Sequence, residues 1–193
     1  MDFPDQANRL PNFARSALVF LSEPNPECED EFVAACLRSE ALHQPWVFPP
    51  CCHEEYQTYL ERIRTGRTIA FLVRRSPDSQ LAGVINISES VMGIFQSAYL
   101  GFYAFAGYER RGYMTAGLAL VLDRAFNELG FHRLEANVQP GNLASAALVA
   151  RLGFRKEGFS PRYLFIDGAW RDHDRWAILA EDWLTYHGKL FGR

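Results

Sequence analysis

The feature that most constrains the fold is a change of hydrophobic period near residue 112. Before it, Ile69, Phe71 and Val73 alternate with their neighbours over residues 68–75, and with 81–88 after the turn SPDSQ this segment forms a predicted β-hairpin. After it, apolar residues from Met114 to Leu129 recur at helical spacing, and Gly130 ends the run. A chain with both periods is predicted to fold as an α/β domain.

The remaining elements complete one mixed sheet with helices on its faces. Further strands are predicted at 17–21, 96–105, 132–139, 162–166 and 176–179. Further helices are predicted from near Pro26, over 54–63, and from the N-cap Asn142 to Gly153. The proline-rich segment 43–50 is expected to be a loop, and Asp167–Gly168 is typical of a hairpin turn.

Length and composition indicate one globular domain. The chain has 193 residues, 48% hydrophobic and 22% charged, with a net charge of -3 that gives no reason to bind nucleic acid. No apolar run is long enough to span a membrane, and the first residues do not resemble a secretory signal, so we expect a cytoplasmic protein. The predicted organisation is a flexible arm over 1–14, a single domain over 15–186 and a tail over 187–193, with the oligomeric state left open.

The four cysteines are expected to be reduced thiols. Cys28 and Cys36 lie eight positions apart in one predicted helix, about 12 Å along its axis, which exceeds the ~7 Å limit for a disulfide. The alternative is a metal site from Cys51, Cys52 and His53, but adjacent cysteines do not have the usual zinc spacing. We therefore expect no metal.

The segment from Glu109 to Thr115 joins a predicted strand to the long helix. A helix N-terminus has amides without partners and a partial positive charge, so it attracts phosphate. Gly112 would let an anion approach the backbone, and Arg110 and Arg111 add positive charge. The same pattern also fits an ordinary turn beside a solvated face.

Three motifs that follow one another along the chain indicate what this segment does. They are R-R-G-Y-M-T at 110–115, N-x-x-S at 142–145 before L-G-F, and I-D-G-x-W-R-D-H at 166–173. With them, the chain resembles the GNAT N-acetyltransferase superfamily, and within it the RimJ/RimL branch of ribosomal-protein N-terminal acetyltransferases. The resemblance runs from about Leu81 to Trp183. It implies a mostly antiparallel central sheet with two splayed parallel strands, and acetyl-CoA as co-substrate without a metal.

The resemblance assigns residues to acetyl-CoA. The glycine loop would bind the pyrophosphate, and the pantetheine arm would lie between strands 96–105 and 132–139. The residues implied are Phe102, Tyr103, Ala104, Arg110, Arg111, Gly112, Tyr113, Met114, Thr115, Asn142 and Ser145. Glu109 and Met114 depart from the family pattern, and Glu109 is expected to point into solvent or to pair with Arg110 or Arg111. Asn142 also has an alternative role as a helix cap alone.

Three residues are candidates for catalysis. By resemblance, Ser145 would protonate the leaving thiolate, because Val149 stands where other branches have a tyrosine. Glu135 and Asn137 share one strand face, where either would hold a water that takes the proton of the incoming amine. The alternative for Glu135 is an ion pair with Arg133. His173 is expected to be a structural or surface residue.

The acceptor is predicted to be an amine of low pKa. A protein α-amino group has a pKa of about 7.7–8.0 and lysine about 10.4, so a site without a strong base suits an N-terminus. The substrate-binding candidates are Trp46, Phe48 and Tyr163, although the two loop aromatics also suit a small satellite core. Four acidic residues either favour a cationic acceptor or are ordinary helix-start charges: Asp30, Glu31, Glu54 and Glu55.

The sequence therefore predicts direct acetyl transfer from acetyl-CoA to a protein N-terminus in a ternary complex. Two alternatives stay open. One is acetylation of a small-molecule amine, and the other is a non-catalytic acyl-CoA-binding module.

Overall fold

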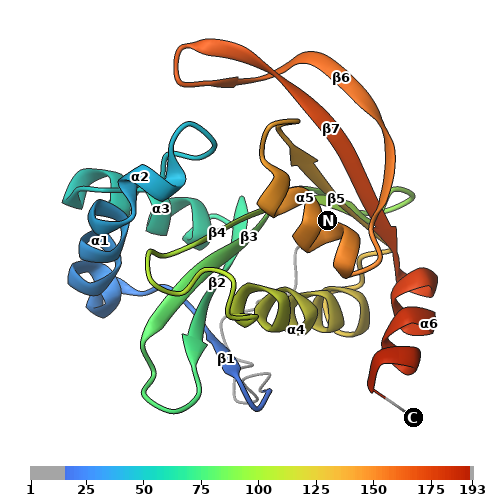
Figure 1. Ribbon diagram of the computed structural model, residues 1–193, viewed down its shortest axis with the longest axis horizontal. Coiled ribbons are helices and arrows are strands. Elements are labelled where there is room, and N and C mark those ends of the chain that lie inside the picture. The colour runs from blue at the N-terminus through green and yellow to red at the C-terminus, as the bar shows by residue number, and fades with distance from the viewer. Residues whose placement is uncertain (1–15, 192–193) are drawn as a thin grey trace.

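The computed structural model describes residues 16–191, with backbone only beyond residue 185, as one seven-stranded sheet with helices on both faces (Figure 1). The strands lie in the order β1-β2-β3-β4-β5-β7-β6, and all neighbours are antiparallel except β4 and β5. Their bounds are β1 Val19–Ser22, β2 Thr68–Arg75, β3 Leu81–Val91, β4 Ser97–Ala104, β5 Arg133–Val138, β6 Arg155–Ile166 and β7 Ala169–Leu179. The predicted mixed, mostly antiparallel sheet is confirmed.

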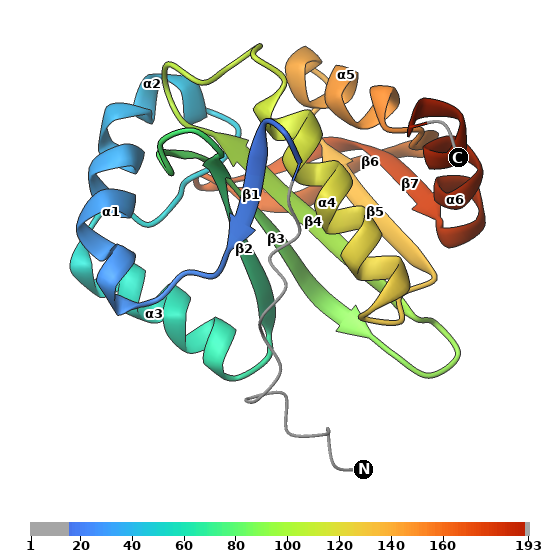
Figure 2. The same cartoon turned by 90° about the horizontal axis from the view of Figure 1, so that it is seen from below.

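Helices cover the two faces of the sheet separately (Figure 2). The helices are α1 Glu29–Arg38, α2 Glu40–His43, α3 His53–Arg64, α4 Tyr113–Asn127, α5 Leu143–Arg151 and α6 Ala180–Phe191. On β2, Phe71 and Val73 pack toward α4 and α5, whereas Ala70 and Leu72 pack toward α1 and α3. This alternation follows the period of two along a strand and gives the domain two cores.

Helix α4 lies unusually close to the sheet because of Gly117. A Cβ at this position would lie 2.7 Å from a methyl carbon of Val73, which is closer than real Cβ atoms approach their neighbours. The absent side chain lets the helix backbone pack directly on β2. The close packing fixes where the N-terminus of α4 meets the sheet.

Strands β4 and β5 pair only over their first halves. Their parallel register runs from Ser97 opposite Arg133 to Leu100 opposite Ala136, after which β4 continues to Ala104 without this partner. We call the unpaired stretch beyond Leu100 the splay, and it confirms the predicted pair of splayed parallel strands. The N–H of Phe105 donates to Ala82 in β3 at 2.9 Å. Because N–H groups alternate sides along a strand, those of Phe102 and Ala104 point into the splay.

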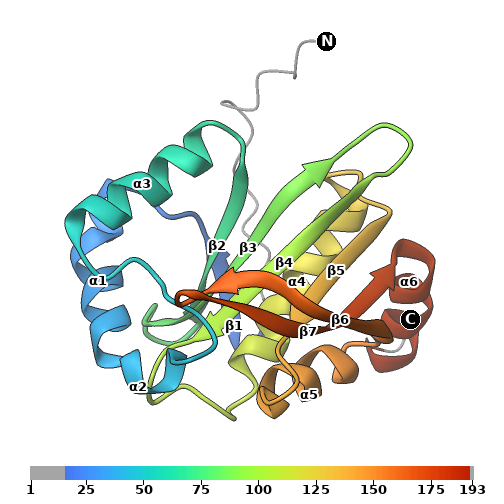
Figure 3. The ribbon, with the colours of Figure 1, turned by 90° about the horizontal axis from the view of Figure 1, so that it is seen from above.

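The last hairpin is longer than predicted. Strands β6 and β7 begin at Arg155 and Ala169, not at 162 and 176, and the hairpin reaches toward the segment between α2 and α3 (Figure 3). The turn at Asp167 and Gly168 is confirmed, with φ of 50° and 69°. Most of β6 is exposed, so no buried face imposes the alternation by which a strand is recognised.

Several smaller features also bear on the predictions. His43 is not in the loop but ends α2, and Cys28 closes a short 3-10 turn from Pro26 before α1 begins. Helix α6 was not predicted from the sequence, while the predicted arm 1–14 lies outside the described residues. Within 16–191, all four cysteines are free thiols and no group of His, Cys, Asp and Glu could hold a metal ion.

The described helices were also compared with the length and hydrophobicity that a membrane span requires. None of these described helices is both long and apolar enough to cross a bilayer.

Candidate active site

The N-terminus of α4 presents unpaired backbone amides. Gly112 is the N-cap residue, with a left-handed φ of 82° and no side-chain cap, and the first helical hydrogen bond runs from Ala116 N–H to the Gly112 carbonyl at 2.9 Å. The N–H groups of Tyr113, Met114 and Thr115 therefore precede the first bond and have no partner within the helix. Among the residues that the structure describes, only Leu18 would contact a Cβ at Gly112, at 3.9 Å, so no described side chain fills the space in front of the backbone. This is the geometry that an anion needs.

The one carboxylate of the loop segment 109–112 is bound within the loop. A carboxylate oxygen of Glu109 accepts a hydrogen bond from the Gly107 N–H at 2.6 Å. It thus neither pairs with Arg110 or Arg111, as one expectation had it, nor lies free in solvent. Both arginines are exposed, and Arg110 has a left-handed φ of 60°. The loop therefore has a net positive charge next to the helix N-terminus.

The splay is bordered on its β5 side by a polar atom without a partner. The Oδ1 of Asn137 is buried and accepts no hydrogen bond from the residues that the structure describes. Asn137 follows Ala136, the last residue of β5 that pairs with β4. A buried acceptor without a donor is costly, so a donor from a bound molecule would satisfy it.

Asn142 and Ser145 open α5 at the end of β5. The Asn142 side chain accepts from the Ser145 N–H at 3.1 Å, so the predicted capping role is confirmed. Ser145 is half-buried, and within residues 16–191 its hydroxyl has no hydrogen-bond partner. The cap therefore fixes Ser145 while its hydroxyl stays available.

Glu135 is engaged in an ion pair. Its carboxylate accepts from the Arg133 Nε at 2.9 Å, and the same guanidinium also pairs with Glu157. These carboxylates raise the pKa of Arg133 further above its ordinary value, the hydrogen bond to Glu157 contributing most. The pairing named as the alternative for Glu135 is thus what the structure has, and Glu135 is not a free base.

Two tyrosines lie on the same face as Glu135. Tyr99 stands opposite Glu135 in the β4–β5 register, and its hydroxyl is hydrogen-bonded to Tyr163. This bond, together with burial and the nearby carboxylate, raises the pKa of Tyr99 to about 12. The ring of Tyr163 also lies 6.1 Å from that of His173, which is buried and hydrogen-bonded to the Arg171 carbonyl. Tyr163 is therefore placed by β6 beside the site, and His173 is structural, as expected.

A groove of about 520 Å³ lies over the α3 face of β4. Its walls come from the loop after α2, from α3 and from strands β2 to β4. The lining residues are Val47, Phe48, Pro49, Pro50, Glu54, Glu55, Thr58, Tyr59, Arg62, Thr68, Asn86, Ser88, Gly101 and Tyr103. We call it the acceptor groove, because Phe48, one of the residues predicted to bind the acceptor, lines it. The other two candidates for acceptor binding, Trp46 and Tyr163, do not line it.

Trp46 instead contacts the end of β5. A Cβ on Gly141 would lie 3.0 Å from the Trp46 ring, and the Gln139 side chain donates to the Trp46 carbonyl at 3.4 Å. Gly141 comes just before Asn142, the cap of α5. One loop therefore reaches the acceptor groove through Phe48 and the cofactor side through Trp46.

His43 is a positioning residue that the sequence did not reveal. It is 3% exposed, and its Nε2 lies 2.8 Å from the Ala104 carbonyl at the end of β4. Because a carbonyl only accepts, Nε2 carries the proton, and the buried Nδ1 has no partner among the described residues. Ser39 adds a second contact, accepting from the Ala106 N–H at 2.9 Å. No sequence motif marks these contacts, since they join segments more than 60 positions apart.

The buried histidines should make stability depend on pH. Burial lowers the pKa of both His43 and His173, so below about pH 6.5 the unfolded chain binds protons that the folded chain does not. Stability should therefore fall from pH 7 to pH 5, by at most about 1.4 kcal/mol per pH unit for each histidine. His43→Gln, which keeps a donor for Ala104, should flatten this slope in urea unfolding at several pH values. The exposed His132→Gln is the control, and an unchanged slope in the His43 variant would contradict the assignment.

Comparison with known proteins shows which family has this fold and sequence. The sequence profile described as "Acetyltransferase (GNAT) domain" matches residues 19–155. The ribosomal protein uS5-alanine N-acetyltransferase of Escherichia coli (strain K12) is 39% identical over 120 residues, which span 62% of each chain.

Two solved structures of acetyltransferases resemble this one. Mycobacterium smegmatis RimJ in complex with CoA-disulfide has 31% identity and a TM-score of 0.75, over 84% of this chain and 82% of that one. Spermidine N-acetyltransferase from Vibrio cholerae, in complex with CoA and spermine, shares the fold at 20% identity with a TM-score of 0.74, over 88% of this chain and 99% of that one. With the profile matching well over half of its length, the chain belongs to the GNAT family of acetyltransferases, which use acetyl-CoA.

Proposed function

We propose that this protein transfers the acetyl group of acetyl-CoA to the α-amino group of a protein N-terminus. One observation supports the proposal: strand β4 borders the splay with its edge and the acceptor groove with its face. Its N–H groups at Phe102 and Ala104 point into the splay, while Gly101 and Tyr103 line the acceptor groove on its face. A thioester along the edge and an amine over the face would therefore meet at the same few residues.

The residues present fit the cofactor. The open backbone at Gly112, the amides of the first turn of α4, and Arg110 and Arg111 suit a pyrophosphate. The free N–H groups in the splay and the unpartnered Asn137 Oδ1 suit the amides of a pantetheine arm. Acetyl-CoA would supply the activated acetyl thioester at the end of that arm.

The chemistry asked of the protein is modest. A β4 N–H directed into the splay would donate to the thioester oxygen and stabilise the negative charge that develops there as the amine attacks. The free hydroxyl of Ser145 would donate its proton to the departing sulfur and regain one from solvent. Asn137 would orient a water that takes the proton released by the amine and passes it to solvent. Transfer is then direct, in a ternary complex.

The state of the carboxylates favours an α-amino group over lysine. Glu135, the carboxylate that was predicted as a candidate base, is held in an ion pair with Arg133. An α-amino group with a pKa of about 7.7–8.0 loses its proton near neutral pH without such a base, whereas lysine at about 10.4 does not. The site therefore suits the acceptor that needs the least help.

The acidic residues considered for a cationic acceptor differ in their state. Glu31 pairs with Arg74 at 2.8 Å, so its charge is compensated. The Glu55 carboxylate accepts from the Cys51 N–H at 2.8 Å, and the pKa of Glu54 is lowered by its own backbone N–H and by Cys52. Both therefore keep their negative charge, and both line the acceptor groove. These charges would also attract a polyamine, so the choice between the two acceptors rests on the pKa of the amine and on the acceptor panel below.

An acceptor panel tests the proposal. Incubated with acetyl-CoA, the protein should acetylate peptides that begin with Ala, Ser or Met, and mass spectrometry should place the acetyl group on the α-nitrogen. Spermidine and free amino acids should react far more slowly. Turnover of small amines without any peptide acetylation would select the first alternative. Tight coenzyme A binding without turnover of either class would select a non-catalytic module. The cytoplasmic location stays a prediction.

A further inference from the structure

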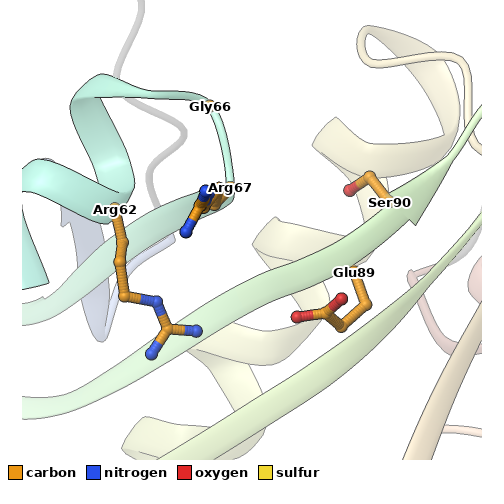
Figure 4. A pocket seen from close by; sticks show the side chains of 5 residues that line it. All are labelled: Arg62, Gly66, Arg67, Glu89 and Ser90. Atoms are coloured by element: carbon orange, nitrogen blue, oxygen red, sulfur yellow. The ribbon is translucent and has the colours of Figure 1, made fainter.

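A second hollow adjoins the acceptor groove. It has a volume of about 500 Å³ and is lined by Arg62, Gly66, Arg67, Glu89 and Ser90 (Figure 4). Arg62 also lines the acceptor groove, so the two hollows share a wall. An acceptor chain that leaves the groove along β3 would enter this hollow next.

The backbone brings the two arginines together. At the end of α3 the chain turns through Gly66, whose φ is 72°, and the Arg67 N–H donates to the Arg62 carbonyl at 2.9 Å. A left-handed residue at this place is the usual way for a helix to end. The consequence is that two guanidinium groups from one helix end border the same hollow, with Glu89 and Ser90 on the opposite wall (Figure 4).

The hollow has an excess of positive charge. Within the described residues, neither Arg62 nor Arg67 has a carboxylate within ion-pair distance, whereas Arg64 on the same helix pairs with Glu61 at 2.7 Å. Glu89 is the one acidic residue in the lining, against two arginines. A planar guanidinium without a partner is well suited to a carboxylate.

The spacing determines which carboxylate would reach the arginines. Asn86 stands opposite Gly101 in the register of β3 with β4, and Ser90 follows four residues later on β3. A regular strand would cover about 13 Å over four residues at roughly 3.3 Å each, but the irregular register between Ser88 and Val91, with a left-handed φ of 51° at Glu89, makes the path shorter here. An extended acceptor whose amine reacts beside Gly101 would therefore place about its fourth residue between Arg62 and Arg67.

We propose that this hollow is an acidic-side-chain subsite, which selects protein N-termini with Asp or Glu near the fourth position. The inference rests on the proposed function and adds a substrate class to it. Glu89 opposes the incoming carboxylate across the hollow and so limits the preference. The same charges would disfavour an acceptor with Lys or Arg at that position.

Paired peptides test the subsite. The peptides are octapeptides that begin with Ala and differ only at position four, which is Glu, Gln or Lys. Their C-terminus is amidated, so the side chain at position four is the only carboxylate that changes within the series. The wild-type protein should give kcat/KM values in the order Glu, Gln, Lys, with about a tenfold ratio between Glu and Lys, as expected for two partly exposed charge pairs. In the double variant R62Q/R67Q, this ratio should fall to about one.

Matched variants make the outcome decisive. Arg38→Gln, which removes an exposed charge at the end of α1, should keep the wild-type ratio, and Glu89→Gln should increase it. A ratio that R62Q/R67Q does not change, in a variant with wild-type melting temperature, overturns the subsite while the acetyltransferase stands. If no peptide is acetylated at all, the proposed function fails instead. Moving Glu to position two or seven should abolish the preference, which a long-range charge effect would not do.

Discussion

Gly112→Trp should weaken coenzyme A binding on the order of a thousandfold. The indole would cover the amides at the start of α4, which removes about two charge-assisted hydrogen bonds at roughly 2 kcal/mol each. The fold should survive, because within residues 16–191 a Cβ at Gly112 would contact Leu18 alone, at 3.9 Å. The left-handed φ of 82° adds a cost in stability of about 1–2 kcal/mol. Isothermal titration calorimetry with coenzyme A measures the effect on binding.

Gly93→Trp is the matched control for this variant. Gly93 also has a left-handed φ, of 74°, and no atom would lie within 4 Å of a Cβ there, but it is located in the turn between β3 and β4. It should lose comparable stability and keep its affinity for coenzyme A. Equal affinities of the two variants would remove the α4 amides from the cofactor site, and with them the main support for the proposed function.

Ser145→Ala should lower kcat about a hundredfold and change KM little. A positioned proton donor contributes on the order of a hundredfold or more, and it acts only when the sulfur departs. The side chain of Asn142 accepts from the backbone N–H of Ser145, so the helix cap persists in the alanine variant. Steady-state kinetics with a saturating peptide measures the change.

Ser97→Ala, at the paired start of β4, is the control and should keep wild-type turnover. A Ser145→Ala enzyme with normal kcat would show that the sulfur leaves without this hydroxyl. A rise in KM with unchanged kcat would instead place Ser145 in binding alone.

Local sequence signals predicted the elements whose faces are buried against a core. The helical spacing after Gly112 corresponds to α4, which packs on the sheet, and the alternation over 68–75 corresponds to β2, whose two faces belong to different cores. The β6–β7 hairpin has no such face along most of its length, so its first residues carry no pattern. Tertiary contacts decided the rest. No local rule brings His43 to the Ala104 carbonyl or Ser39 to the Ala106 N–H.

The candidate site likewise contains residues that the sequence could predict and residues that it could not. Gly112 and Asn142 were predictable because a helix end imposes chemical requirements on its own sequence. The state of Glu135 was not, since strand periodicity gives the face of the sheet but not the neighbour. Only the structure shows that Arg133 holds this carboxylate and Glu157 together.

The unpairing of β4 from β5 has a kinetic consequence. Because one ligand would approach along the edge of β4 and the other across its face, their routes of entry and exit do not overlap. Spent coenzyme A can then depart while the acetylated polypeptide is still bound, or remain after it has left. Product-inhibition patterns should accordingly show no obligatory order of release.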